Sequence, residues 1–161
     1  MHEVQVARTI GVSADEAWKI IDDFGGIYQY HPVVERSHIS NGVASGLGAE
    51  RVCHFDNGDA ITEQITAYDP GREYTVEITD LGKFPLVRGV ARLSVEPAGA
   101  GRSTVQFTMR FQPKFGPLGW LMGKTVMRSQ FRKILASVLA GLETHATTGA
   151  IVSRKPRPQA A

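Results

Sequence analysis

The sequence predicts an α+β fold in which a series of strands is closed by one long C-terminal helix. Residues 105–111 alternate strictly, as a strand does, with an apolar face formed by Val105, Phe107, Met109 and Phe111. After the turn-rich stretch 113–119, apolar residues return at helical spacings of three, four and seven: Met127, Phe131, Ile134, Leu135, Val138 and Leu142. A curved sheet around such a helix often leaves a hollow, so the first hypothesis is a container for a small molecule.

The N-terminal part is predicted to be a strand followed by two short helices. The strand covers residues 3–12. The segment 13–16, Ser-Ala-Asp-Glu, is a capping box, in which the serine oxygen accepts from the third helical amide. Gly25-Gly26 is expected to end this first helix. A second helical turn at 27–30 ends before Pro32, because a proline disfavours helical geometry in the residue before it.

From residue 33 to 111 the pattern predicts about six strands. Asn-Gly within 56–59 favours a tight hairpin turn, because both positions tolerate positive φ. Further turns are predicted at Asp69-Pro70-Gly71 and at 98–101. Alternation assigns two sets of side chains to the interior: Ile61, Glu63, Ile65 and Ala67 in one strand, and Val87, Gly89, Ala91, Leu93 and Val95 in another.

Two small residues on the second of these interior faces suggest a cavity. A packed strand usually carries β-branched or aromatic side chains at such positions, whereas Gly89 and Ala91 leave volume opposite the helix. A close approach of the helix would explain the same residues. On these residues alone a hollow and a solid core are equally compatible with the sequence, and a hollow that serves as an ordinary ligand site would measure a few hundred Å³.

Glu63 is the most unusual residue of the predicted interior. A buried carboxylate without a partner costs several kcal/mol or becomes protonated, which would raise its pKa. Three interpretations stay open: an ion pair with Arg51 or another inward base, a position near the sheet edge, or a polar anchor or acid/base group inside a pocket.

The histidines and the single cysteine give no sign of a metal site or cofactor. No two histidines have metal-ligand spacing, and Cys53 alone cannot form an internal disulfide. Of the five histidines, His2 and His145 are expected to be solvated, and His31 alone is taken as a functional candidate. With an ordinary pKa near 6.5, it would carry a proton close to neutral pH. No nucleophile motif or phosphate-binding loop is present.

Composition bounds the remaining classes. A net charge of +2 gives no electrostatic case for nucleic acid. Residues 1–150 are expected to form a single domain, followed by a disordered tail at 151–161. No apolar run reaches about 18 residues and no N-terminal signal is seen, which predicts a soluble, cytoplasmic protein. Trp120 and Met122 form an apolar lip, but membrane contact is not favoured, and the oligomeric state is left open.

An ordered set of short motifs resembles the START/birch-pollen-allergen-like superfamily, also called SRPBCC, of polyketide cyclase/dehydratase and lipid-transport type. The motifs are Ile10 to Trp18, Asp23-Phe24, Tyr30 to Val34, Gly48 to Arg51, Thr62-Glu63, Asp69-Pro70, and Tyr74 into Val95-Glu96-Pro97. The resemblance implies a helix-grip fold: a seven-stranded antiparallel sheet around a long C-terminal helix, with two short helices after the first strand.

Within the superfamily, the chain is similar to plant abscisic-acid receptors at a few positions. That similarity places His31 where those receptors carry a ligand-binding lysine, and Glu63 at their pocket glutamate. Their gate loop is replaced here by the tight turn 56–59, and their latch falls on Phe84-Pro85-Leu86. The loss of gate, latch and lysine argues against hormone reception.

The leading hypothesis is a binding or carrier protein for a small hydrophobic molecule. The expected ligand-binding residues are Trp18, His31, Arg51, Cys53, Phe55, Glu63, Phe84, Leu86, Gly89, Ala91, Leu93, Phe107, Met127, Phe131 and Leu135. One alternative is a cyclase or dehydratase in which His31 or Glu63 moves a proton. Another is a structural or partner-binding domain with a solid core. Whether the protein is an enzyme at all is left open.

Overall fold

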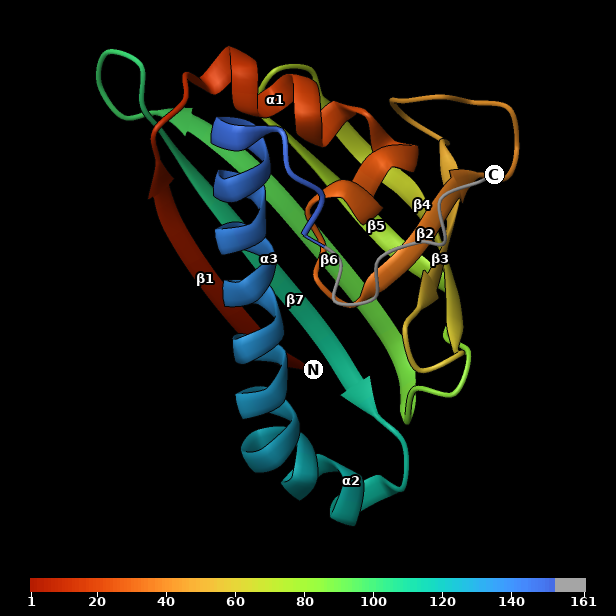
Figure 1. Ribbon diagram of the computed structural model, residues 1–161. Coiled ribbons are helices and arrows are strands. Elements are labelled where there is room, and N and C mark those ends of the chain that lie inside the picture. The colour runs from red at the N-terminus through yellow and green to blue at the C-terminus, as the bar shows by residue number, and fades with distance from the viewer. Residues whose placement is uncertain (153–161) are drawn as a thin grey trace.

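Seven antiparallel strands form a single curved sheet in the computed structural model, which describes residues 1–152 (Figure 1). The strands are β1 (His2–Ile10), β2 (Val34–Ile39), β3 (Glu50–Phe55), β4 (Ala60–Asp69), β5 (Glu73–Asp80), β6 (Leu86–Pro97) and β7 (Ser103–Pro113). Their order is β1-β7-β6-β5-β4-β3-β2, so each strand from β2 to β7 pairs with its neighbour in sequence. β1 closes the far edge by pairing with β7.

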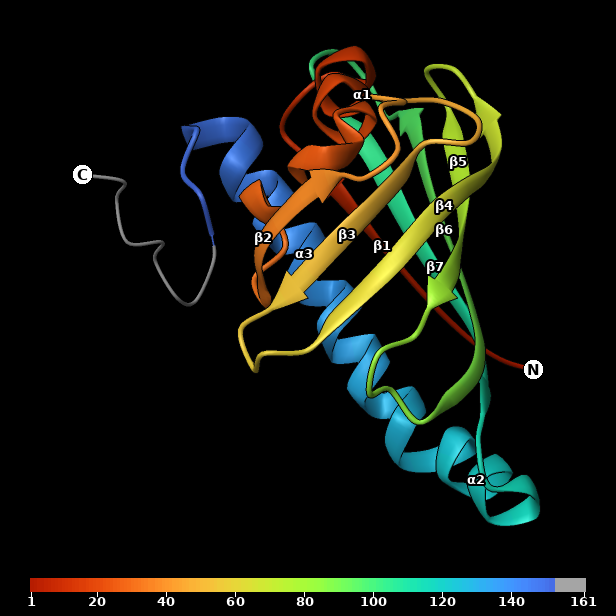
Figure 2. The same cartoon turned by 90° about the vertical axis from the view of Figure 1, so that its right-hand side faces the viewer.

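The helices occupy one face of this sheet. Two short ones follow β1, and a kinked series follows β7: α1 (Ala14–Asp22), the 3-10 helix η1 (Phe24–Gln29), α2 (Gly116–Met122), the π-helical turn η2 (Gly123–Met127) and α3 (Arg128–Thr148). Figures 1 and 2 show α3 running along the sheet, with α1 at one end of the molecule and α2 at the other. This is the helix-grip fold that the sequence resemblance implied.

The predicted capping of α1 is confirmed, but the predicted end of the helix is displaced. The Ser13 hydroxyl accepts from the Glu16 backbone N–H at 3.2 Å. The helix ends at Asp22, before the two glycines, which lie inside η1. A Cβ at Gly26 would meet the Asp23 carboxylate, so a larger residue there would require the Asp23 side chain to move.

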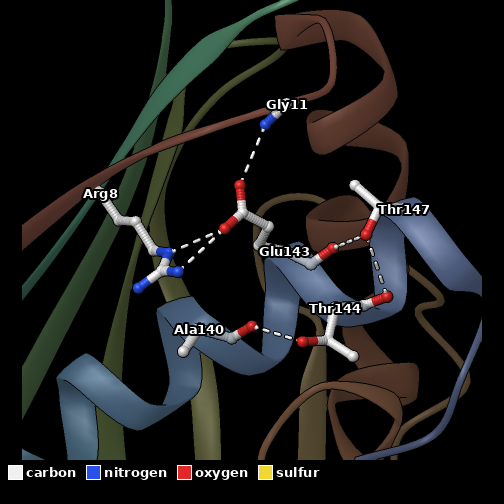
Figure 3. Close-up of polar contacts among 6 residues, drawn as sticks. All are labelled: Arg8, Gly11, Ala140, Glu143, Thr144 and Thr147. Carbon is white, nitrogen blue, oxygen red and sulfur yellow. Dashed lines mark hydrogen bonds and ion pairs between the residues drawn. The ribbon is translucent and has the colours of Figure 1, made fainter.

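A carboxylate on α3 joins this helix to the first strand (Figure 3). The Glu143 side chain accepts from the Arg8 guanidinium at 2.9 Å and from the Gly11 backbone N–H at 3.1 Å. The hydrogen bond from Arg8 is the main reason that the pKa of Glu143 is lowered. Because both contacts are partly exposed, they fix the direction of α3 more than they stabilise it.

One glycine of α3 closely approaches the connection that follows η1. On α3, the side chains of Leu135, Val138, Leu139 and Leu142 are buried. Gly141 lies among them, and a Cβ at this position would come within 2.3 Å of the backbone oxygen of Tyr30. The helix therefore approaches the η1–β2 connection to a distance that only glycine permits.

Two β-bulges reverse the predicted inward faces of β4 and β6. The pairing of β4 with β5 shifts register between Ile65 and Ala67, and beyond that point Ala67 is exposed. Tyr68 turns inward instead, where its hydroxyl donates to Asp22 at 2.8 Å. At the start of β6, a shift after Leu86 leaves Leu86 buried and Val87 58% exposed. The predicted inward positions of Ala67 and Val87 were therefore wrong.

The ends of the described chain also differ from expectation. His2 was predicted to be solvated, but it is buried, because β1 begins there and pairs it with Phe111. Its ring lies 5.7 Å from that of Trp120. The predicted tail begins at residue 151, yet the Val152 N–H donates to the Gln29 carbonyl at 3.2 Å. The rest of that tail, 153–161, lies outside the described residues. Among residues 1–152, no helix has the length and apolar character needed to cross a membrane.

Candidate functional site

A cavity in two connected parts lies between the sheet and α3. The inner chamber has a volume of about 50 Å³ and the outer chamber about 250 Å³. Side chains from η1 through α3 line them, and six residues belong to both: His31, Phe55, Ile61, Glu63, Ala91 and Phe107. The two parts therefore form one space with a narrow inner end.

The inner chamber contains a buried ion pair. Strand pairing places Arg51 of β3 directly opposite Glu63 of β4, with both side chains pointing inward. The Arg51 Nε donates to Glu63 Oε2 at 2.7 Å, and Nη1 donates to the Phe24 carbonyl at 3.0 Å. Burial lowers the pKa of Arg51, but the Glu63 carboxylate raises it, and the net shift is upward. The Arg51 guanidinium therefore stays charged, and the carboxylate beside it offsets this charge within the chamber.

The other polar groups of the inner chamber are neutral at physiological pH. Burial, and then the charge of Glu63, raise the pKa of the Cys53 thiol to about 12. Burial, followed by the nearby Tyr74, also raises the pKa of Tyr30. The Tyr30 hydroxyl is fully buried near the Tyr74 side chain and makes no hydrogen bond of normal geometry among residues 1–152. A buried hydroxyl without a partner carries a desolvation cost that a bound polar atom would remove.

Backbone hydrogen bonds hold His31 in place where the two chambers meet. Its N–H donates to the Ile27 carbonyl at 2.9 Å, and its carbonyl accepts from Val34 at 3.2 Å. Burial, and then the positive charge of Arg51, lower the pKa of the imidazole to about 3. The expectation of a proton carried near neutral pH is therefore wrong. The Val33 N–H donates to Nδ1 at 3.4 Å, which leaves the imidazole hydrogen on Nε2 as a donor.

The outer chamber is apolar, and two hairpin loops border it. The β3–β4 turn contributes Asp56 and Asn57, and the β5–β6 loop contributes Phe84, whose ring meets that of Phe55 edge-on at 5.6 Å. The Asp59 carboxylate accepts from the Lys83 backbone N–H at 3.0 Å, which ties one loop to the other. The two loops, at the positions that the sequence resemblance assigned to a gate and a latch, are thus fastened together.

Most of the residues predicted for the site line the cavity. Arg51, Cys53 and Leu93 lie at the inner chamber, and Phe84, Leu86, Phe131 and Leu135 at the outer one, in addition to the shared residues His31, Phe55, Glu63, Ala91 and Phe107. That these residues bind a ligand stays a prediction.

Three predicted residues lie outside the lining of either chamber. Trp18 packs instead against the rings of Tyr68 and Tyr74, at 5.9 and 6.3 Å. At Gly89 there is no hollow, because a Cβ would lie 2.8 Å from Ile78 Cδ1 and 3.2 Å from Met109 Cε. Met127 is buried in the π-helical turn η2, before the part of α3 that borders the cavity.

Sequence reasoning missed the two tyrosines of the inner chamber. Tyr30 and Tyr74 were both seen as parts of family motifs, but neither was assigned to the site. Tyr74 pairs with Leu93 across β5 and β6, and Leu93 had been assigned inward, so register alone could have found it. Tyr30 lies in the irregular connection after η1, where no periodicity indicates a direction.

The arrangement is better suited to binding than to proton transfer. Neutral His31 holds its hydrogen on Nε2, and the carboxylate of Glu63 is engaged by Arg51. Neither is a free general base at neutral pH. Within residues 1–152, no three His, Cys, Asp or Glu side chains are grouped so that they could hold a metal ion.

Comparisons with known proteins agree with the fold. The model of the family described as polyketide cyclase/dehydrase and lipid transport matches residues 1–147. No curated protein matches the chain significantly.

Several solved structures are similar over nearly the whole chain. The protein XoxI from Bacillus cereus has 20% identity and a TM-score of 0.77, with 92% of this chain and 97% of that chain covered. A START superfamily protein from Mycobacterium smegmatis has 15% identity and a TM-score of 0.74, covering 93% and 100%. The Zhui aromatase/cyclase from Streptomyces sp. R1128 has 16% identity and a TM-score of 0.68, covering 92% and 97%. At such identities the likeness shows the fold alone.

Proposed function

Because the chain belongs to the polyketide cyclase/dehydrase and lipid transport family, we propose that it binds a small hydrophobic molecule carrying an uncharged oxygen acceptor at one end. The apolar body of this molecule lies in the outer chamber. Its oxygen, a carbonyl for example, points into the inner chamber. The protein holds this molecule without converting it.

The unpartnered hydroxyl of Tyr30 is the observation that carries this proposal. It is buried in a residue that lines the inner chamber, and a ligand oxygen that reached this hydroxyl would accept its hydrogen. The Nε2–H of His31 is a second donor. Two donors carried by residues that line the inner chamber favour a ligand with an acceptor atom, and a hydrogen bond to the Tyr30 hydroxyl adds affinity that a pure hydrocarbon lacks.

Charge balance favours a neutral ligand head over a carboxylate. Arg51 is already neutralised by Glu63 at 2.7 Å, so a second anion in this buried space would have no counter-charge. Burying an uncompensated charge costs much more than burying a hydrogen-bonded carbonyl. Size favours a compact molecule, since the cavity is near the lower end of the ~300–1,000 Å³ range of ligand pockets.

The cyclase or dehydratase alternative requires a group that accepts a proton near neutral pH. With a pKa of about 3 and Nδ1 facing a backbone N–H, His31 does not supply one. Glu63 could accept a proton only after its ion pair with Arg51 is broken, and the buried guanidinium would then have no counter-charge. Holding and carrying the ligand is therefore the function that the geometry supports best. The cytoplasmic location stays a prediction.

Three naphthalene probes of nearly equal shape test this proposal: 2-acetonaphthone, 2-ethylnaphthalene and 2-naphthoate. Calorimetric titration of the full chain should give the tightest binding for the ketone, weaker binding for the hydrocarbon, and the weakest for the carboxylate. Replacing Tyr30 by Phe should reduce ketone affinity by about 2- to 13-fold, the usual value of one hydrogen bond, and leave the affinity for the hydrocarbon unchanged. Binding of the carboxylate in preference to the ketone would contradict the proposed ligand class.

A further inference from the structure

An exposed apolar patch surrounds α2. Of the eleven large apolar side chains that are exposed within residues 1–152, six lie between 115 and 126. We call these six the α2 patch: Phe115, Leu118, Trp120, Leu121, Met122 and Val126. Monomeric proteins rarely show so many contiguous apolar residues to water unless the surface binds something.

The packing of α2 is inverted relative to an ordinary surface helix. Leu118, Leu121 and Met122 share one face at helical spacing, but this face is exposed. The glycines point inward instead: a Cβ at Gly119 would lie 1.5 Å from the Lys114 carbonyl oxygen, and one at Gly123 2.6 Å from the His2 ring. Small residues thus anchor the helix to the protein while its large apolar residues point away from it.

The charged residues that lie near α2 along the chain are all positive. From residue 97 to 142 the chain has no aspartate or glutamate, whereas Lys114 and Lys124 flank α2 and Arg132 and Lys133 follow on α3. Lys114 and Lys124 are exposed, and the ammonium of Lys124 lies 5.3 Å from the centre of the Trp120 ring. Exposed tryptophan with neighbouring cations is typical of surfaces that rest at the interface of an anionic membrane.

The α2 patch lies at the same end of the molecule as the loops that border the outer chamber. Figures 1 and 2 show α2 projecting beyond the strand ends at which β7 finishes and β6 begins. The turn η2 connects α2 to α3, and Phe131, in the first turn of α3, lines the outer chamber. A surface held by α2 would therefore face the same end as the outer chamber.

We propose that the α2 patch, together with Lys114 and Lys124, is a docking surface for an anionic lipid bilayer. The apolar side chains enter the interfacial region, Trp120 lies at the level of the headgroups, and the lysines contact anionic headgroups. Although the sequence alone did not favour membrane contact, the exposure of these six residues changes that expectation. The proposal concerns the outer surface and does not depend on what the cavity binds.

Vesicle flotation of the full chain tests the proposal. The protein should float with vesicles of phosphatidylcholine and phosphatidylglycerol, much less with phosphatidylcholine alone, and less again when salt is raised. The double variant Leu118→Glu/Leu121→Glu should lose at least tenfold of this binding. In the variant Lys114→Glu/Lys124→Glu, the affinity for the anionic vesicles should fall by about fivefold or more for each cation removed. This variant should then bind little to either kind of vesicle.

Leu47→Glu is the matched control. Leu47 is 68% exposed on the loop between β2 and β3, at the opposite end of the molecule from α2, so this variant should bind vesicles like the original chain. Equal flotation with both kinds of vesicle, or flotation unchanged by Leu118→Glu/Leu121→Glu, would overturn the proposal. A third outcome would also overturn it: the protein does not float, and sedimentation velocity shows a dimer that Leu118→Glu/Leu121→Glu abolishes. The α2 patch would then join two copies of the chain.

Discussion

His31 owes its protonation state to burial. The imidazole is 9% exposed and faces the same chamber as the Arg51 guanidinium, so a proton on the ring would be both desolvated and repelled. Its folded pKa of about 3 lies below the value of 6.5 for a free histidine. Between these two values the unfolded chain binds a proton that the folded chain does not.

The pH dependence of stability tests this assignment. Since His31 contributes stability above pH 6.5 that is lost as pH falls towards about 3, the free energy of unfolding should drop on acidification. The slope from this one group reaches about 1.4 kcal/mol per pH unit. His31→Asn should remove that part of the slope in urea unfolding, whereas His38→Asn, at an exposed position, should not. Equal slopes in both variants would mean that His31 titrates normally in the folded protein.

Sequence reasoning found the unusual residues of the inner chamber but not the hydrogen-bond or ion-pair partner of each. Periodicity singled out Glu63, because alternation places it between two isoleucines, and it left three interpretations open. The β3–β4 register decides among them by placing Arg51 directly across. Register depends on the length of the turn 56–59 and on pairing along the whole hairpin, which one strand's pattern does not contain.

At the scale of the strands, the predicted faces hold until a bulge interrupts the alternation. One extra residue reverses every later side chain, which is why Ala67 and Val87 are exposed while Tyr68 and Leu86 turn inward. The bulge in β4 has no glycine or proline beside it, whereas the bulge in β6 follows Pro85 and lies where Leu86 pairs with Pro113. In the rest of β6, beyond its bulge, the prediction is confirmed. Ala91, Leu93 and Val95 are buried, and Arg92 forms an ion pair with Glu73 on the outer face.

Ala91 offers a test of the cavity itself, since it lines both chambers and its small side chain leaves the space open. Ala91→Leu should lower the affinity for 2-acetonaphthone by about tenfold or more, which is about 1.4 kcal/mol. The free energy of unfolding should change by less than about 1.5 kcal/mol, because the new atoms enter empty space. Val90→Leu, on the opposite face of the same strand, should bind normally in the same calorimetric titration. Undiminished binding by Ala91→Leu would place the ligand elsewhere.

For the whole molecule, the order and type of the elements followed from the sequence, but the distance between α3 and its neighbours did not. Apolar periodicity predicted the long helix and its buried face. Nothing in that periodicity shows that Gly141 touches the backbone of Tyr30, because the two lie far apart in sequence. This contact fixes both the position of α3 and the wall of the inner chamber that carries the Tyr30 hydroxyl.

Replacing Gly141 by Ala should reverse the usual effect of this substitution. In an ordinary helix, glycine to alanine stabilises by about 1 kcal/mol. Here the new methyl group would lie 2.3 Å from the Tyr30 oxygen, so α3 or the η1–β2 connection must shift, at a cost of about 1–3 kcal/mol. Urea unfolding should show a net loss, and ketone binding should weaken because Tyr30 moves. Gly11→Ala, where nothing lies within 4 Å of the added Cβ, is the control and should be neutral or slightly stabilising. A stabilised Gly141→Ala protein would show that α3 is not held against Tyr30 this closely.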